Sequence, residues 1–123
     1  MANVVTDVGL GLITALLAAS DHKYLAWGTG TTPPVVTDTA LETPAAEART
    51  SGTSTQETTT TTNDTYQVEG TITCAGSAKV ITEIGLFDAS TSGNLYIRAT
   101  FSPINVSVGD SIIFTIGTVF DQL

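Results

Sequence analysis

The chain has 123 residues, of which 41% are hydrophobic and only 13% are charged, so it is long enough to form one domain around an apolar core. Its net charge of −8 comes from 12 acidic and four basic residues, and such a surface repels the phosphate backbone of nucleic acids. Cys74 is the only cysteine, which excludes an intrachain disulfide and a cysteine-rich metal site within the chain.

The first segment with a clear pattern is residues 4–20, which predicts an amphipathic helix capped by Thr6 or Asp7. One apolar face follows the helical spacing and consists of Gly9, Leu12, Ile13, Leu16 and Leu17. The apolar run is too short for a bilayer span, and no basic residue precedes it as in a signal peptide. We therefore expect no membrane segment.

The segment YLAWGTGTTPP, residues 24–34, combines a short strand with a glycine-rich stretch. The Gly-Thr-Gly of residues 28–30 resembles the start of a phosphate-binding loop, but no lysine follows it, and a proline pair occupies the place of the helix that such a loop opens. We therefore exclude a nucleotide site. The sequence predicts instead that Trp27 anchors the helix to the sheet, and that residues 28–38 leave the sheet as an extended arm.

Residues 49–65 (RTSGTSTQETTTTTNDT) are rich in threonine and could form either a disordered linker or a long strand exposed on both faces. We favour the strand because threonine is β-branched and no proline interrupts the segment. Residues 28–65 as a whole are thus expected to form an extended arm or loop and a threonine-rich strand.

The clearest strand patterns lie in the remaining part, residues 66–120. Apolar and polar residues alternate from Tyr66 to Cys74, which is typical of a half-buried strand and places the cysteine in the core. Residues 79–89 predict a strand buried on both faces, in which Gly85 marks a bulge or a close approach of another segment to the backbone.

Two further strands complete the pattern. Residues 95–101 alternate in the same way and form a hairpin with the preceding strand over residues 80–101, which Pro103 ends, and a last strand covers residues 111–120. The chain is therefore predicted to be mainly β, a single domain over residues 1–123. Its expected architecture is an antiparallel β-sandwich with one N-terminal α-helix and extended Thr/Pro-rich arms.

The sequence offers no arrangement typical of catalysis. His22 and Cys74 are the only strong transition-metal ligands besides carboxylates and lie 52 positions apart, and no Gly-x-Ser-x-Gly motif is present. His22 is expected to be solvated or to cap the helix end. We expect Glu83 to form a structural ion pair with Arg98 across the hairpin. No catalytic, cofactor-binding or metal site is predicted, and the protein is not expected to be an enzyme.

Three segments occur in a characteristic order: KYLAWGTGTT at residues 23–32, DTALETPAAEARTSGT at residues 38–53, and QVEGTITCAGSAKVITEIGLFDA followed after a turn by GNLYIRATFSPINVSVGDSIIFTIGTV at residues 67–119. Together they resemble a family of small structural proteins of tailed double-stranded DNA bacteriophages, some of which are capsid cement (decoration) proteins. The last segment also resembles parts of phage tail and fibre proteins.

The resemblance implies a structural virion protein, commonly a homotrimer, that is made in the host bacterial cytoplasm and binds the outer surface of the mature phage head. There it would bridge subunits of the major capsid protein, without a small-molecule substrate or a nucleic-acid or membrane partner. Our hypothesis is that the arms reach these neighbours by strand addition or hydrophobic docking. The candidate contact residues are Thr31, Pro33, Pro34, Val35, Thr58, Thr60 and Thr62.

Two alternatives to the capsid role stay open. A tail, baseplate or fibre-attachment protein would belong to the same virion but contact the tail or a fibre. A carbohydrate-binding module is a further alternative, because many β-sandwiches bind sugars, but it needs exposed aromatic side chains. Only 7% of the residues are aromatic, and we assign Tyr24, Trp27, Tyr66 and Tyr96 to packing.

Overall fold

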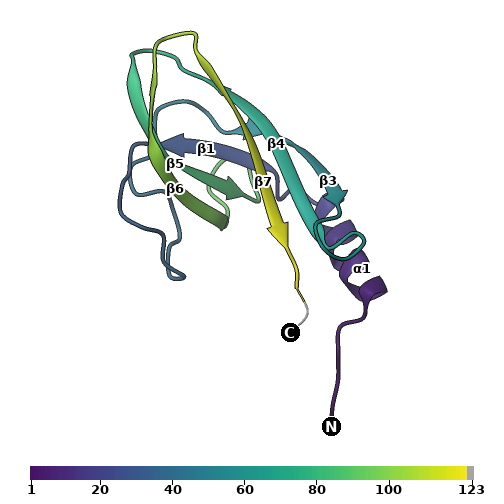
Figure 1. Cartoon of the computed structure of the whole chain (residues 1–123). Helices are drawn as coiled ribbons and strands as arrows, with labels where there is room; N and C mark the ends of the chain where they lie inside the picture. The colour runs from purple at the N-terminus through teal and green to yellow at the C-terminus, as the bar shows by residue number, and fades with distance from the viewer. Residues whose placement is uncertain (122–123) are drawn as a thin grey trace.

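The computed structural model describes residues 1–121 and shows a mainly β protein with two antiparallel sheets and one short helix (Figure 1). The first sheet has the strand order β2-β1-β5-β6 and the second the order β3-β4-β7. This arrangement confirms the predicted β-sandwich. In chain order the elements are α1 (Asp7–Ala18), β1 (Tyr24–Gly28), β2 (Thr50–Ser51), β3 (Thr53–Glu57), β4 (Thr65–Thr73), β5 (Lys79–Phe87), β6 (Leu95–Val106) and β7 (Ser111–Val119).

The core lies between the two sheets and follows the alternation of the sequence. On β4 and at the position after it, the buried side chains are those of Tyr66, Val68, Ile72 and Cys74. The two-residue period of side chains along a strand predicts this pattern. They belong to one apolar cluster with side chains of β1 and β5, namely Leu25, Trp27, Ile81, Ile84 and Leu86. The half-buried strand and the core position of Cys74 are thereby confirmed.

Strand β5 is buried on both faces, as predicted, because two different layers cover it. Ile84 and Leu86 join the core, and the opposite face is covered by the connection between β1 and β2. Gly85 makes room for that connection, since a Cβ atom there would lie 2.8 Å from the Cδ2 atom of Leu41. The close approach that the glycine indicated is therefore real.

Strand β6 continues to Val106, so the predicted end at Pro103 is wrong. The register between β5 and β6 shifts here, with Ile81 opposite Ile104 and Glu83 opposite Thr100, and this leaves an extra stretch that contains the proline. Because β6 is the last strand of its sheet, the missing N–H of proline breaks no ladder on its outer side.

Helix α1 is shorter than predicted and turns a different face to the protein. It spans Asp7–Ala18, and the hydroxyl of Thr6 caps it by accepting a hydrogen bond from the Gly9 N–H at 3.1 Å. Leu10 and Thr14 are buried, whereas three residues of the predicted apolar face, Leu12, Ile13 and Leu16, are exposed. Within residues 1–121 no helix is long and apolar enough to cross a membrane.

A polar contact explains how the helix is rotated. Thr14 is fully buried, and its hydroxyl donates to the Asn63 carbonyl at 2.7 Å and lies 2.8 Å from Nε2 of Gln56. The same Nε2 also donates to the Gly11 carbonyl at 2.7 Å. Since a buried hydrogen-bonding group without a partner is costly, these contacts fix the helix against β3 and the loop that follows it.

The threonine-rich segment does not form one long strand, so that prediction is wrong. Gly52 separates β2 from β3, and after Glu57 the chain bends into a loop, residues 58–64. The carboxylate of Asp64 closes this loop by accepting three backbone N–H groups, those of Thr59, Thr60 and Thr61, at 2.8–2.9 Å. An acidic side chain that accepts several nearby N–H groups favours a turn over an extended strand.

Because Thr14 is buried and hydrogen-bonded, replacing it should destabilise the protein more than replacing an exposed threonine. We expect Thr14→Val to lower the free energy of unfolding by about 1 to 3 kcal/mol, because it leaves the Asn63 carbonyl without its donor. The same change at the exposed Thr71 should stay within about 0.5 kcal/mol. Urea unfolding of both variants measures the difference, and equal losses would contradict the assignment.

Candidate interaction surfaces

A buried carboxylate, that of Glu83 on β5, organises the connection between β1 and β2. Its Oε1 accepts hydrogen bonds from the N–H groups of Gly30 at 3.1 Å and Thr43 at 2.8 Å. Its Oε2 accepts from the Glu42 N–H at 3.1 Å and from Nε of Arg98 at 2.9 Å. The Gly-Thr-Gly stretch thus surrounds a carboxylate of the protein itself.

The two glycines of this stretch leave room for the Glu83 carboxylate, which a Cβ atom at either position would contact. A Cβ atom at Gly28 would lie 2.5 Å from Oε1 of Glu83 and 2.4 Å from the Thr43 carbonyl oxygen, and one at Gly30 would lie 2.7 Å from the same Oε1. Real Cβ atoms do not approach oxygen so closely. The Gly-x-Gly pattern therefore reflects the close approach of an internal anion.

Arg98 on β6 extends the hydrogen-bond network of Glu83 toward the surface. Besides the ion pair with Glu83, which confirms the pair predicted from the hairpin, its guanidinium contacts Asp38 at 2.9 Å and Glu42 at 3.4 Å, and it donates to the Thr32 carbonyl at 3.0 Å. One side chain thus ties both halves of the β1–β2 connection to the sheet. Residues 28–38 were predicted to form an extended arm; instead they are part of a loop that Glu83 and Arg98 hold against the sheet.

Charge and hydrogen bonding together keep Glu83 ionised. Burial alone would raise its pKa, but the hydrogen bonds from the Thr43 N–H, from Arg98 and from the Glu42 and Gly30 N–H groups outweigh burial, and the pKa lies below its usual value. Burial lowers the pKa of Arg98, but the carboxylates of Glu83 and Asp38 outweigh burial and raise it. The cluster is a fully paired ionic network.

The network presents a short exposed tip at residues 33–37, which we call the arm tip. A turn closes it, with the Val35 N–H donating to Oδ2 of Asp38 and the Asp38 N–H donating to the Val35 carbonyl, both at 3.0 Å. Val35 and Val36 are both exposed. The arm tip is therefore apolar, and Arg98 holds its base in place through Asp38.

The candidate contact residues fall into two separate places. The candidate residues in the β1–β2 connection lie at or next to the arm tip and are exposed. The candidate residues in the threonine-rich segment are exposed on the loop 58–64. Figure 1 shows the connection between β1 and β2 on one side of the molecule and this loop beside α1 on the other. The structure does not bring the two groups together, and each remains a separate prediction. The residues are Thr31, Pro33, Pro34 and Val35 in the first group and Thr58, Thr60 and Thr62 in the second.

The sequence predicted that Trp27 anchors the helix to the sheet, and this prediction is wrong. Helix α1 packs against β3 and β4, whereas the indole lies between the sheets, edge to face with Phe114 at 6.3 Å between ring centroids. Its Nε1–H donates to Oε2 of Glu47 at 2.9 Å, a carboxylate that also binds Lys79 and the Ala75 N–H. Trp27 therefore fastens the returning end of the β1–β2 connection to the core.

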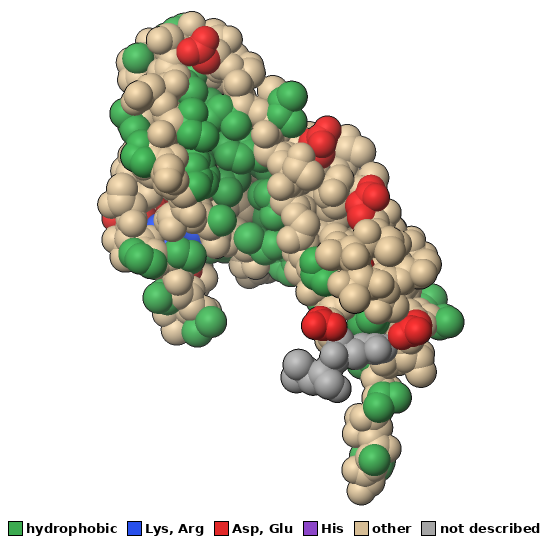
Figure 2. All heavy atoms as spheres, viewed as in Figure 1, with side chains coloured by type: hydrophobic (Ala, Val, Ile, Leu, Met, Phe, Trp, Pro, Cys, Tyr) green, Lys and Arg blue, Asp and Glu red, His purple; other side chains and the backbone are tan. Residues whose placement is uncertain are grey.

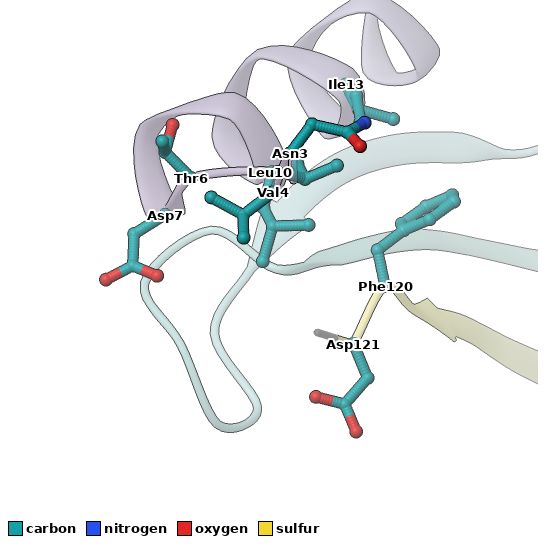
Figure 3. Close-up of a pocket in the computed structure, with 9 residues that line it drawn as sticks. Asn3, Val4, Thr6, Asp7, Leu10, Ile13, Phe120 and Asp121 are labelled. Carbon is teal, nitrogen blue, oxygen red and sulfur yellow. The ribbon is translucent and has the colours of Figure 1, made fainter. Parts of the chain in front are cut away.

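A second apolar surface lies along α1, and it includes Leu12 and Leu16 of the apolar face predicted from the sequence. Val8, Leu12 and Leu16 recur at helical spacing and are all exposed. Beside them the N-terminal segment, α1 and the end of the chain enclose a hollow of about 720 Å³ (Figure 3). Its lining residues are Asn3, Val4, Val5, Thr6, Asp7, Leu10, Ile13, Phe120 and Asp121.

The two residues weighed as metal ligands have local partners. Nδ1 of His22 lies 2.7 Å from the hydroxyl of Ser20, and Cys74 is buried with its Sγ 3.3 Å from the Ser77 carbonyl oxygen. Among residues 1–121 no group of three or more His, Cys, Asp or Glu side chains is placed to hold a metal ion.

The fold and these clusters define a β-sandwich whose buried polar groups serve to fix surface loops. The sequence adds the particular family, because residues 10–120 match the family described as Podophage GP4 fiber I protein gp80. The match covers most of the 123 residues, so the chain belongs to this family and is a bacteriophage structural protein of the virion. No curated protein and no solved structure matches the chain.

Removing the charge of Glu83 should destabilise the whole protein. We expect Glu83→Gln to lower the free energy of unfolding by on the order of 3 kcal/mol, because it leaves Arg98 without its buried counter-ion and turns an amide toward three N–H donors. The exposed Glu57 provides the matched control, since Glu57→Gln should cost less than about 0.5 kcal/mol. Chemical denaturation of the two variants makes the comparison, and a stable Glu83→Gln protein would contradict this role.

The carboxylates also predict a loss of stability in acid. Burial raises the pKa of Glu47, but hydrogen bonds from the Ala75 N–H, Lys79 and Trp27 lower it to about 2, and the pKa of Glu83 is likewise lowered. Their stabilisation is complete above about pH 4.3, the ordinary pKa of glutamate. It is lost as the pH falls through the lower folded-state values.

We therefore expect the free energy of unfolding to decrease steadily between about pH 4.3 and pH 2. Denaturant titrations across this range measure the slope. In Glu83→Gln the slope should be shallower, because one of the depressed carboxyl groups is gone. A stability that does not change down to about pH 2.5 would contradict the prediction.

Proposed function

We propose that the protein is a fibre-related structural component of a tailed phage virion, attached to a neighbouring virion protein through exposed loops on its β-sandwich. The observation that carries this proposal is the family match over residues 10–120, whose description names a fibre protein of a podophage. Fibre-related proteins work by attachment, and the polar clusters of this chain serve that end because they fix loops in place.

The family description favours the fibre alternative over the capsid cement role that came first in the sequence analysis. Under this proposal the partner is a protein of the fibre or of its attachment site, and the major capsid protein becomes the partner of the competing assignment. The homotrimer expected from the resemblance stays a prediction.

The carbohydrate-binding alternative loses its support, because the aromatic side chains are used for packing. Trp27 and Tyr66 are fully buried, and Tyr24 and Tyr96 are half-buried. Tyr66 and Tyr96 also pack edge to face at 6.2 Å between ring centroids. Sugar-binding modules stack pyranose rings on exposed aromatic faces, and these four residues do not form such a platform.

The arm tip is the part best suited to attachment. It is exposed, apolar and already held in one conformation by Asp38 and Arg98, so little conformational entropy is lost when a partner binds it. The proline pair at the start of the tip restricts its backbone further. A preformed apolar tip on a strongly acidic protein can dock without bringing like charges together, since no acidic residue lies within residues 33–37.

The position in the virion decides between the two assignments. Antibodies against the purified protein, coupled to gold and applied to intact particles, should label the tail or fibre region. Label distributed over the head would overturn the fibre proposal and favour capsid decoration.

A charge on the arm tip should prevent attachment without unfolding the protein. We expect Val36→Asp to reduce the copies incorporated per virion at least tenfold, because a partner pocket for valine would have to bury a carboxylate. Ala78→Asp, on the exposed turn between β4 and β5, serves as the control and should be incorporated normally. Quantitative immunoblots of purified virions measure both, and equal incorporation would exclude the arm tip as a contact.

A further inference from the structure

The sandwich is open along one side, where the last strands of the two sheets face each other. Among the described residues 1–121, strand β6 pairs with β5 alone and β7 with β4 alone. Between them lies a hollow of about 600 Å³, lined from β6 by residues 101–104 and from β7 by residues 112–115. Figure 2 shows hydrophobic side chains gathered in a hollow between the sheets. We call this side of the protein the open seam.

The core itself reaches the surface at the open seam. The inward residues of the central strands β4 and β5 are almost completely buried, but those of the two outer strands that pack against the same cluster are only partly buried. On β7 these are Ile112, Phe114 and Ile116. Core residues that are buried on the central strands but half-exposed on the outer strands indicate a surface that another chain covers.

The two strands at the seam are not equally protected against pairing. Edge strands usually carry charges, prolines or bulges that prevent the addition of a further strand. Strand β6 has Pro103 and the register shift beside it. Strand β7, Ser111–Val119, has nine residues without a charge or a proline. Strand β7 is therefore the edge that is free to pair.

The sequence of β7 matches itself when two copies run in opposite directions. With Phe114 opposite its own equivalent, an antiparallel pair places Ile112 opposite Ile116, so the inward apolar residues of one copy meet the same set from the other. On the outer face the exposed Ile113 then meets Thr115. Such a contact is self-complementary, as a two-fold interface requires.

Electrostatics favours the same occupant. Two chains that each carry a charge of −8 repel one another, and the repulsion is smallest when the surfaces in contact carry no charge. Strand β7 has no charged residue, and the only charged residue of β6 is Arg98, whose side chain is 4% exposed and paired with acids inside its own chain. A partner selected for opposite charge would find nothing to bind here.

We infer that a second copy of this chain covers the open seam by antiparallel pairing of β7 with β7 around Phe114. The pairing joins the two three-stranded sheets into one sheet of six strands and covers the half-buried residues of β7. This self-association is a property of the isolated protein, so it stands or falls independently of the place of the protein in the virion.

Two variants that differ at one position test the register. In Ile113→Lys with Thr115→Lys, each new lysine stands opposite a lysine of the other copy, and like charges directly opposite destabilise a strand pair. In Ile113→Glu with Thr115→Lys, each glutamate stands opposite a lysine. Both variants carry Thr115→Lys beside Glu69, which accepts a hydrogen bond from Thr115 at 3.0 Å, so the effect of that change within one chain is matched.

Size-exclusion chromatography with light scattering gives the mass of each protein, and circular dichroism checks that each is folded. We expect the wild-type protein and the Glu/Lys variant to have twice the mass of the chain, and the Lys/Lys variant to have the mass of a monomer. A monomeric wild-type protein would overturn the inference, as would a Lys/Lys variant that stays dimeric. A wild-type trimer would overturn the two-fold pairing and favour the homotrimer prediction.

Discussion

The path of the chain between β1 and β2 depends on one buried carboxylate, that of Glu83. A buried negative charge must be matched by donors, and here Gly30, Glu42 and Thr43 supply backbone N–H groups while Arg98 supplies the counter-ion. These donors come from both halves of the connection, so the folded protein cannot satisfy Glu83 without closing the connection over β5. The closed connection in turn completes the burial of that strand.

The sequence predicts well whatever depends on neighbours along the chain. The alternation from Tyr66 to Cys74 identifies β4 because inward and outward positions differ by one residue. The pair of Glu83 and Arg98 follows from the hairpin, since a buried acid on one strand needs a base on the next. The two-sheet architecture and the one helix among residues 1–121 could be predicted in the same way.

What the sequence could not predict depends on contacts between distant segments. The helix is oriented by a threonine, because Thr14 bonds to the loop at Asn63, and a pattern of apolar residues contains no sign of that. The connection between β1 and β2 and the loop 58–64 were expected to be extended, but the carboxylates of Glu83 and Asp64 fold each of them by accepting backbone hydrogen bonds. The exposure of the seam appears only once both edge strands are placed.

In the loop 58–64, the groups that set the backbone path are not the side chains that form the surface. Its path is set by backbone N–H groups that bind the carboxylate of Asp64, and every residue except proline has such a group. The side chains of Thr60 and Thr62 therefore lie on a loop whose backbone path does not depend on them. Substitutions of those two side chains therefore change the surface chemistry of the loop while its backbone keeps the same path.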